Sequence, residues 1–258
     1  MISRETWPPP TQEYWRIVKA SAGLRQLHIQ LCGQESPLLK IPKDALLMGR
    51  RLTPLLQIAS VASWRMGTKY PDLKLSIQLH DEDPGASSLR FDASIDDQAI
   101  LLPDPYALGS QGYYLIRKSL SQYPLPTWRE RKPIAFWRGS STGSKSITVK
   151  RIDKNRRIKL CQLSLLLPKC LDAKITDLVQ CRDQKAKEEL TQFLGKSGIL
   201  SERSSPRDYG LHQYLIEIDG NVNSWGFLWK LLTGCCILRV KSKRRQWYHH
   251  QLNDYENI

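Results

Sequence analysis

Small polar and basic residues follow an apolar run in the stretch PIAFWRGSSTGSKS (133–146). Guanidinium, hydroxyl and backbone N–H groups are the donors that bind phosphate in proteins, and this loop supplies them at Arg138, Gly139, Ser140 and Ser141. The P-loop pattern G-x-x-x-x-G-K-[ST] does not fit, because Gly139 and Gly143 lie one residue too close together. α/β proteins nevertheless bind anions at the carboxyl ends of parallel strands. The residues alone leave two interpretations open, an anion-binding loop and a polar surface turn.

A second polar loop lies inside the stretch YLIEIDGNVNSWGFLWKLLTGCCILRV (214–240), which has the pattern of one βαβ unit. The first strand is predicted to end at Asp219 and Gly220, and Ser224 is predicted to cap a helix that Gly234 closes. A helix N-terminus offers free N–H groups to a phosphate. We expect Arg138 and the serines of both loops to lie together around a diphosphate, since both loops leave the same edge of the sheet.

Strands and helices alternate regularly in the second half of the chain. Strands are predicted at 134–138, 172–179, 213–218 and 236–240, with helices around 150–166, 183–195 and 224–233. This alternation predicts a parallel sheet with both faces covered.

The first half is less regular, and the Pro-rich stretch YPLPTWRERKP (123–133) indicates a linker after it. A helix is predicted from an N-cap at Asp44 to about Trp64, bent at Pro54, followed by strands at 74–81 and in QAILLPDPY (98–106). The length of 258 residues suits either one large domain or two of about half that size. We expect two domains, 1–126 and 127–258.

Charge and cysteine content narrow the class of partner and compartment. Lys and Arg number 39 against 25 Asp and Glu, and the formal net charge of +14 favours anionic partners. The six cysteines lack zinc-site spacing, and a chain of this length does not need disulfides, so a reducing compartment is expected. Neither a signal-peptide pattern nor an apolar run long enough to span a membrane is visible, which predicts a cytoplasmic location and leaves peripheral membrane contact open.

The two loops belong to a wider set of residues that resembles glycosyltransferase family 90, the CAP10-like proteins and protein O-glucosyltransferases. The set is Trp137-Arg138-Gly139-Ser140, Tyr214-Leu215, Asp219-Gly220, Ser224, Lys230-Leu231, Gly234 and Gln246-Trp247-Tyr248. The resemblance is strong over 134–252 and faint before residue 70. It implies a GT-B fold, in which two Rossmann-like domains face a cleft, and inverting transfer from a UDP-sugar to a glycan or protein hydroxyl. Neither a metal nor a cofactor is implied, and no DxD pair follows a strand in the C-terminal half.

The resemblance also implies roles for residues of this chain. The donor would be bound by Arg138, Gly139, Ser140, Ser141, Asp219, Gly220, Asn223, Ser224 and Lys230. The family's base is an Asp near the end of a first-domain strand, which corresponds here to IQLHDEDPG (77–85) and favours Asp81, with Asp83 as the alternative. An acidic turn before Pro-Gly is the other interpretation of this segment. The acceptor would lie near Asp104, Tyr106 and Tyr113, whose rings could equally be ordinary packing.

The chain departs from the family pattern in two places. Trp225 and Gly226 stand where animal members carry a second phosphate-facing Arg, as expected of a bacterial, lipopolysaccharide-modifying type, and NDYENI (253–258) replaces a Pro-Trp-x-His-Tyr segment. A GT-B domain normally continues beyond this point, so the C-terminal domain is expected to be incomplete, in a truncated or inactive member.

Two other function classes compete with the enzyme. A catalytically degenerate scaffold would bind sugar nucleotide or glycan without turnover. A nucleic-acid-binding protein would use the positive charge and the eight Trp residues, but its basic residues should form a continuous stripe, and here they are scattered without a recognisable motif.

Overall fold

The computed structural model describes residues 16–19, 26–32, 35–41, 49–66, 73–79, 81 and 89–252. By their contacts these fall into two compact units, one containing the described residues up to Gly112 with Arg245–His249, the other Tyr113–Arg244 and the residues from His250. The domain bounds 1–126 and 127–258 stay a prediction, because compactness does not establish independent folding.

The second unit is built on a four-stranded parallel sheet. Its strands are β8 (Lys132–Ser140), β9 (Leu171–Asp177), β10 (His212–Glu217) and β11 (Cys236–Arg239), in the order β11-β10-β8-β9. All three neighbouring pairs are parallel. The predicted strands and their parallel arrangement are therefore confirmed for this half of the chain.

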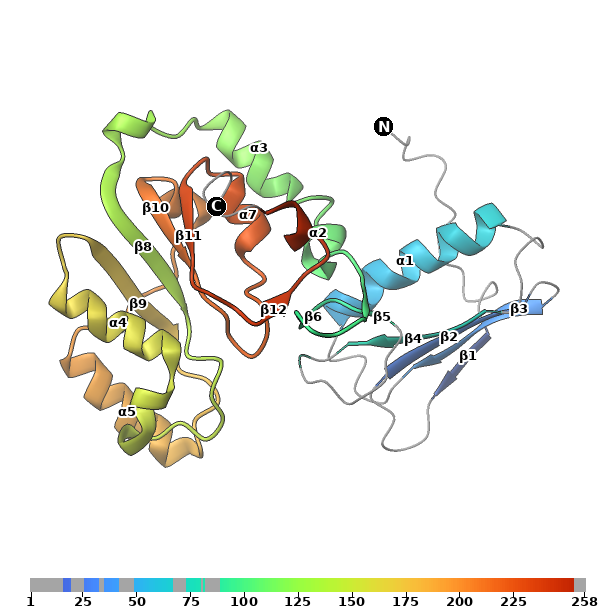
Figure 1. The fold of residues 1–258 in the computed structure, drawn as a ribbon, viewed down its shortest axis with the longest axis horizontal. Coiled ribbons are helices and arrows are strands. Elements are labelled where there is room, and N and C mark those ends of the chain that lie inside the picture. Colours follow the sequence, from blue (N-terminus) through green and yellow to red (C-terminus); the bar gives the residue numbers. More distant parts are fainter. Residues whose placement is uncertain are drawn as a thin grey trace. The chain divides into compact units, whose positions relative to one another are not determined.

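Helices cover both faces of this sheet. On one face Trp137 and Ile216 pack with residues of α4 (Arg156–Leu166) and α5 (Gln184–Lys196). On the other, Phe136 and Leu215 pack with Tyr209 of α6 (Pro206–Tyr209) and Trp229 of α7 (Phe227–Leu231). Neighbouring strand residues point to opposite faces, so the sheet has apolar side chains on both. Figure 1 shows α4 and α5 together on one side of β9 and α7 on the other.

Two predicted helices differ from those observed. The helix expected around 150–166 begins as a 3-10 turn, η4 (Val149–Lys154), before α4 starts after its N-cap Asn155. The helix expected at 224–233 is only the five residues of α7, and its N-cap is Gly226, so the prediction that Ser224 caps it is wrong. The Ser224 hydroxyl instead accepts from the Gly226 N–H at 3.3 Å, a local turn that competes with helix formation. Gly234, at φ +64°, follows the helix as expected.

The first unit contains a mixed sheet in the order β1-β3-β2-β4-β5-β7. Only two positions separate β2 (Gln26–Cys32) from β3 (Glu35–Ile41), too few for a crossover, so these strands must pair antiparallel. β2 is also antiparallel to β4 (Leu73–Gln78), whereas the outer pairs are parallel. The remaining strands are β1 (Arg16–Lys19), β5 (Leu89–Arg90) and β7 (Ile100–Leu101). The expected GT-B pairing of two Rossmann-like domains stays a prediction, and this sheet is not all-parallel.

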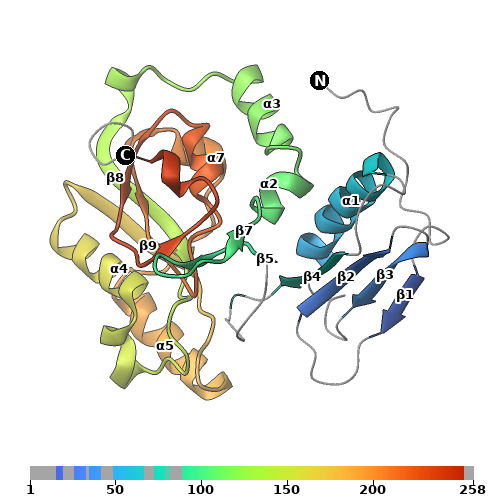
Figure 2. The ribbon, with the colours of Figure 1, turned by 45° about the vertical axis from the view of Figure 1, so that its right-hand side comes forward.

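Helix α1 (Gly49–Met66) lies across one face of this sheet (Figure 2), with Pro54 inside it. Leu52 and Leu55 of α1 are buried, as are Leu27, Leu39 and Ile77 of the sheet. The predicted helix is thus confirmed from Gly49 onward, while its expected N-cap Asp44 lies outside the described residues.

Short elements complete the two units. The first unit contains β6 (Ala93–Ser94), and in the same unit Arg245, the last residue of β12 (Arg244–Arg245), donates to the carbonyls of Asp97 and Ala99 at 2.5 and 3.2 Å. The others are α2 (Pro105–Gly109), α3 (Tyr114–Gln122), η3 (Trp128–Glu130) and η5 (His249–Gln251). Among the described helices, none has the length and apolar character needed to cross a bilayer.

Candidate functional site

The two polar loops singled out in the sequence meet at the carboxyl edge of the parallel sheet. A Cβ atom at Gly220 would lie 2.5 Å from the Thr142 hydroxyl, and one at Gly143 would lie 3.0 Å from the Gly220 carbonyl oxygen. A side chain at position 220 would displace the Thr142 hydroxyl, so glycine there permits the close contact of the loops.

Arg157 ties the loops together from the first turn of α4. Its guanidinium donates to the Ser140 carbonyl at 3.1 Å and the Thr142 hydroxyl at 2.6 Å, and to the carbonyls of Ile218 and Asp219 at 3.0 Å each. Burial lowers the pKa of Arg157, while the carboxylates of Glu217 and Asp219 oppose that shift. Four acceptors thus use the planar fork of donors that only an arginine offers.

Asn155 fixes the position of Arg157. It is fully buried, its Oδ1 accepts from the N–H groups of Arg157 and Ile158 at 3.0 Å, and its Nδ2 donates to the Ser141 carbonyl at 2.7 Å. Sequence reasoning missed both residues. Asn before a helical pattern is an N-cap signal, but nothing in the sequence distinguishes the buried Arg157 from its exposed neighbour Arg156.

The loop after β9 joins the same edge. The Gly143 N–H donates to the side-chain oxygens of Gln180 and Asn221, both at 3.1 Å, and the Gln180 amide donates to Asn221 at 2.9 Å. Gly143 has φ +106°, a conformation suited to glycine. Three loops are therefore joined by polar contacts at this edge.

A cavity of about 550 Å³ opens beside these loops. It is lined by Arg138, Ser140, Thr142, Thr176, Asp177, Val179, Gln180, Arg203, Ser204 and Tyr209. Hydroxyl, amide and guanidinium groups dominate this lining, which suits a polar, anionic ligand.

Arg138 lines the cavity as expected but already has partners. Its Nη2 lies 2.8 Å from the Asp172 carboxylate, and its Nη1 donates to the carbonyls of Trp137 and Asp172. The guanidinium also lies over the Phe136 ring, 4.2 Å from the ring centre. Arg138 thus brings positive charge to the cavity while being held by the protein.

The other residues predicted in the first loop differ in accessibility. Ser140 lines the cavity, whereas Ser141 is fully buried and its hydroxyl exchanges hydrogen bonds with the backbone of Val179, both at 2.9 Å. Gly139 allows the close approach of the Trp137 ring, since a Cβ there would lie 2.6 Å from it. The Tyr209 hydroxyl donates to the Arg138 carbonyl at 2.8 Å, and burial raises the pKa of Tyr209 to about 12.

The predicted residues of the second loop are distributed between edge and core. Asp219 and Gly220 lie at the joined edge through the contacts of Arg157 and Thr142. Asn223 is buried, and Ser224 is half-buried within its own turn. Lys230 is buried, where its ammonium donates to the Glu217 carboxylate at 2.5 Å and the Ile216 carbonyl at 3.0 Å. A donor-binding role for Lys230 would require breaking that buried ion pair.

The predicted base and an acceptor residue share one partner in the first unit. Arg51 of α1 lies 2.6 Å from the Asp81 carboxylate and donates to the Leu79 carbonyl at 2.6 Å. Its guanidinium carbon is 5.9 Å from the centre of the Tyr106 ring. Burial acts to lower the pKa of Arg51, but Asp81 and Tyr106 outweigh it and the pKa is raised. Asp83, the alternative base, lies outside the described residues.

The expected acceptor residues have distinct local roles. Asp104 is buried as the N-cap of α2 and accepts from the N–H groups of Tyr106 and Ala107 at 2.7 and 3.3 Å. Tyr113, in the second unit, has φ 57° and its hydroxyl lies 3.4 Å from the Trp225 carbonyl. Their part in acceptor binding stays a prediction.

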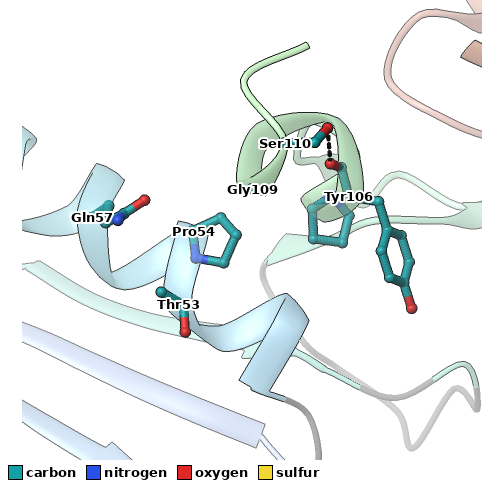
Figure 3. Close-up of a pocket in the computed structure, with 7 residues that line it drawn as sticks. Thr53, Pro54, Gln57, Tyr106, Gly109 and Ser110 are labelled. Atoms are coloured by element: carbon teal, nitrogen blue, oxygen red, sulfur yellow. Dashed lines mark hydrogen bonds between the residues drawn. The ribbon is translucent and has the colours of Figure 1, made fainter. Parts of the chain in front are cut away.

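A cavity of about 440 Å³ lies between α1 and α2, within the first unit. Figure 3 shows Thr53, Pro54 and Gln57 of α1 opposite Gly109, the last residue of α2, and Ser110, which follows it, with the Tyr106 ring extending away from Gln57. The Ser110 hydroxyl donates to the Tyr106 carbonyl at 2.6 Å.

Within the part of the chain that the structure describes, no group of three or more His, Cys, Asp or Glu side chains is placed to hold a metal ion.

The parallel sheet, with helices on both faces and a polar cavity at its carboxyl edge, defines the second unit as an α/β unit. Residues 111–257 match the model of Glycosyl transferase family 90. Because this match covers more than half of the 258 residues, the chain belongs to that family.

Similar sequences occur in large viral proteins. Uncharacterized protein 035R of Invertebrate iridescent virus 3 is 28% identical over 133 residues, and Uncharacterized protein 179R of Invertebrate iridescent virus 6 is 28% identical over 148 residues; each match covers 50% of this chain. Uncharacterized protein 027R of Frog virus 3 is 41% identical over 59 residues, 23% of this chain. The matches cover 12%, 12% and 6% of the three viral proteins.

Proposed function

We propose that this chain carries the nucleotide-sugar site of an inverting, metal-independent glycosyltransferase. The donor is a UDP-sugar of glucose or xylose type, and the acceptor is a hydroxyl group of a glycan or protein. The observation that carries the proposal is the carboxyl-edge cavity, whose two loops are joined by Arg157 within the family-matched region. Family membership supports the reaction class.

In the proposed reaction an acceptor oxygen attacks the anomeric carbon from the side opposite the diphosphate. The new carbon–oxygen bond forms as the bond to the diphosphate oxygen breaks, and UDP leaves with the bonding electron pair. A base removes the acceptor hydroxyl proton; Asp81 is the proposed base and Asp83 the alternative. The developing charge on the leaving diphosphate requires cations or N–H donors, since no metal is proposed.

The joined loops give the proposal a direct test with UDP. Gly220→Ala would place a Cβ 2.5 Å from the Thr142 hydroxyl and 3.1 Å from an Arg157 nitrogen, so the side chains that join the loops, or the loops themselves, must shift. We expect isothermal titration calorimetry to show UDP affinity lowered about tenfold or more, equivalent to about 1.4 kcal/mol.

Gly195→Ala is the matched control. This glycine lies in α5, where the nearest atom to a new Cβ would be 4.0 Å away, and we expect unchanged UDP affinity. Failure of the unaltered protein to bind UDP would refute the donor assignment. UDP binding without sugar transfer to any hydroxyl acceptor would instead favour the degenerate scaffold. Transfer that stops when EDTA is added would refute the metal-independent mechanism.

A further inference from the structure

The cations around the carboxyl-edge cavity differ in how firmly the protein holds them. Arg157 is buried and bonded to both loops, and the Arg138 side chain is 11% exposed with its guanidinium on Asp172. Releasing the Arg157 guanidinium would leave the buried Ile218 carbonyl without this donor, and releasing that of Arg138 would break its ion pair with Asp172. Neither is suited to leave its partners when a ligand enters.

Arg203, which also lines the cavity, is held by the protein much less firmly than Arg157 and Arg138. Its side chain is 80% exposed, and its Nε and Nη2 lie 3.1 and 2.8 Å from a single carboxylate oxygen of Asp177. Asp177 ends β9 and its side chain is 39% exposed. Exposed ion pairs of this kind contribute little to stability because water competes for both groups. Arg203 can therefore exchange its partner readily.

We propose that Arg203 is the exchangeable phosphate-binding residue of this cavity, and that Asp177 holds it there until a diphosphate displaces the carboxylate. This inference rests on the proposed function and adds a residue to that site. The Nε and Nη2 donors already point to one oxyanion, and the same fork can bind two phosphate oxygens. A phosphate group, with more negative charge and more acceptor oxygens than a carboxylate, is the stronger partner for it.

Asp177 is expected to weaken diphosphate binding, whereas Arg203 is expected to strengthen it. Its negative charge at the cavity repels a diphosphate and competes for Arg203. Removing the charge while keeping the side-chain shape should therefore strengthen diphosphate binding, whereas removing Arg203 should weaken it.

The test is calorimetric titration of the full chain with UDP, uridine and inorganic pyrophosphate. Arg203→Ala should weaken UDP and pyrophosphate binding about tenfold and leave uridine binding unchanged, because uridine has no phosphate. Asp177→Asn should strengthen UDP binding a few-fold, and the gain from this change should be smaller when Arg203 is already Ala, because only the relief of charge repulsion then remains. Arg203→Lys keeps the charge without the fork and should give an intermediate affinity.

Arg182→Ala is the control, because Arg182 forms a similar exposed pair with Asp183 but does not line the cavity. Its UDP affinity should equal that of the unaltered protein. UDP binding that Arg203→Ala leaves unchanged, or equal losses for UDP and uridine, would overturn the inference while the proposed donor stands. Arg203-dependent binding of pyrophosphate with no added affinity for UDP would support the inference and refute the UDP donor. Absence of binding to all three probes would overturn both.

Discussion

Residue types at the two loops indicate anion binding, but the contacts decide which side chains can serve it. Arg138 and Lys230 were both predicted to bind the donor, yet each forms an ion pair within the protein. A buried charge must be paired because losing water is costly. Arg157 and Arg203, which the sequence did not single out, occupy the joined edge and the exposed rim of the cavity.

Replacing Asp81 tests whether this residue is the base of the proposed reaction. Asp81→Asn keeps an oxygen for the hydrogen bond from Arg51 but removes the basic carboxylate. In a preparation that transfers sugar, we expect turnover to fall about a hundredfold or more while UDP affinity stays nearly constant. Steady-state rates and calorimetry on the same preparation measure the two effects.

Asp83→Asn is the comparison for that experiment. If it abolishes transfer while Asp81→Asn does not, Asp83 is the base. If neither change affects transfer, the acidic cluster is a turn. Thermal unfolding of Asp81→Asn serves as the folding control, because the altered residue pairs with the buried Arg51.

At the scale of elements, two adjacent thiols lie at the start of β11, where Cys235 directly precedes the strand and Cys236 is its first residue. Cys235 is buried, with its sulfur within 3.3 Å of Arg131 and 3.1 Å of the His212 carbonyl, whereas Cys236 is exposed. Successive residues of an extended chain point in opposite directions, which accounts for the difference.

We therefore expect a thiol reagent to modify Cys236 much faster than Cys235 in the folded protein. Cys161 should also be slow, since it is fully buried and burial raises the pKa of its thiol to about 12. Peptide mass spectrometry after a short labelling pulse resolves the sites. Rapid modification of Cys235 would contradict the buried position, and labelling in denaturant provides the control for complete reactivity.

At the scale of the whole molecule, the formal net charge of +14 should attract anions over long distances. We expect UDP affinity to fall as NaCl is raised from about 0.05 to 0.5 M, because screening shortens the Debye length from about 14 Å to about 4 Å. Uridine, measured in the same calorimetric series, should show little change. If UDP and uridine binding depended equally on salt, the expected attraction between the protein's positive charge and the phosphates would be contradicted. If oligonucleotides bound more tightly than UDP and in a salt-sensitive manner, the nucleic-acid alternative would be favoured.

Periodicity in the sequence determined the second half of the fold, because strands buried on both faces and helices with one apolar face leave separate patterns. β8 to β11, α4 and α5 were predicted from those patterns and observed. The short α7 and its cap were not, since Ser224 satisfies a local turn instead. In the first half, β1 to β3 were not predicted, and their pairing depends on contacts between strands.

The sequence also determined that two polar loops would leave one sheet edge, because parallel strands end on the same side. Only the tertiary structure decided how they are held there. Arg157 is adjacent to Arg156 in sequence, and just one of them is directed into the core to bond both loops, while the other is exposed and bonds to the Lys241 carbonyl. That difference arises because α4 begins after its N-cap Asn155, which determines the direction of each side chain around the helix. It also depends on strands far apart in the chain, whose positions no local sequence pattern contains.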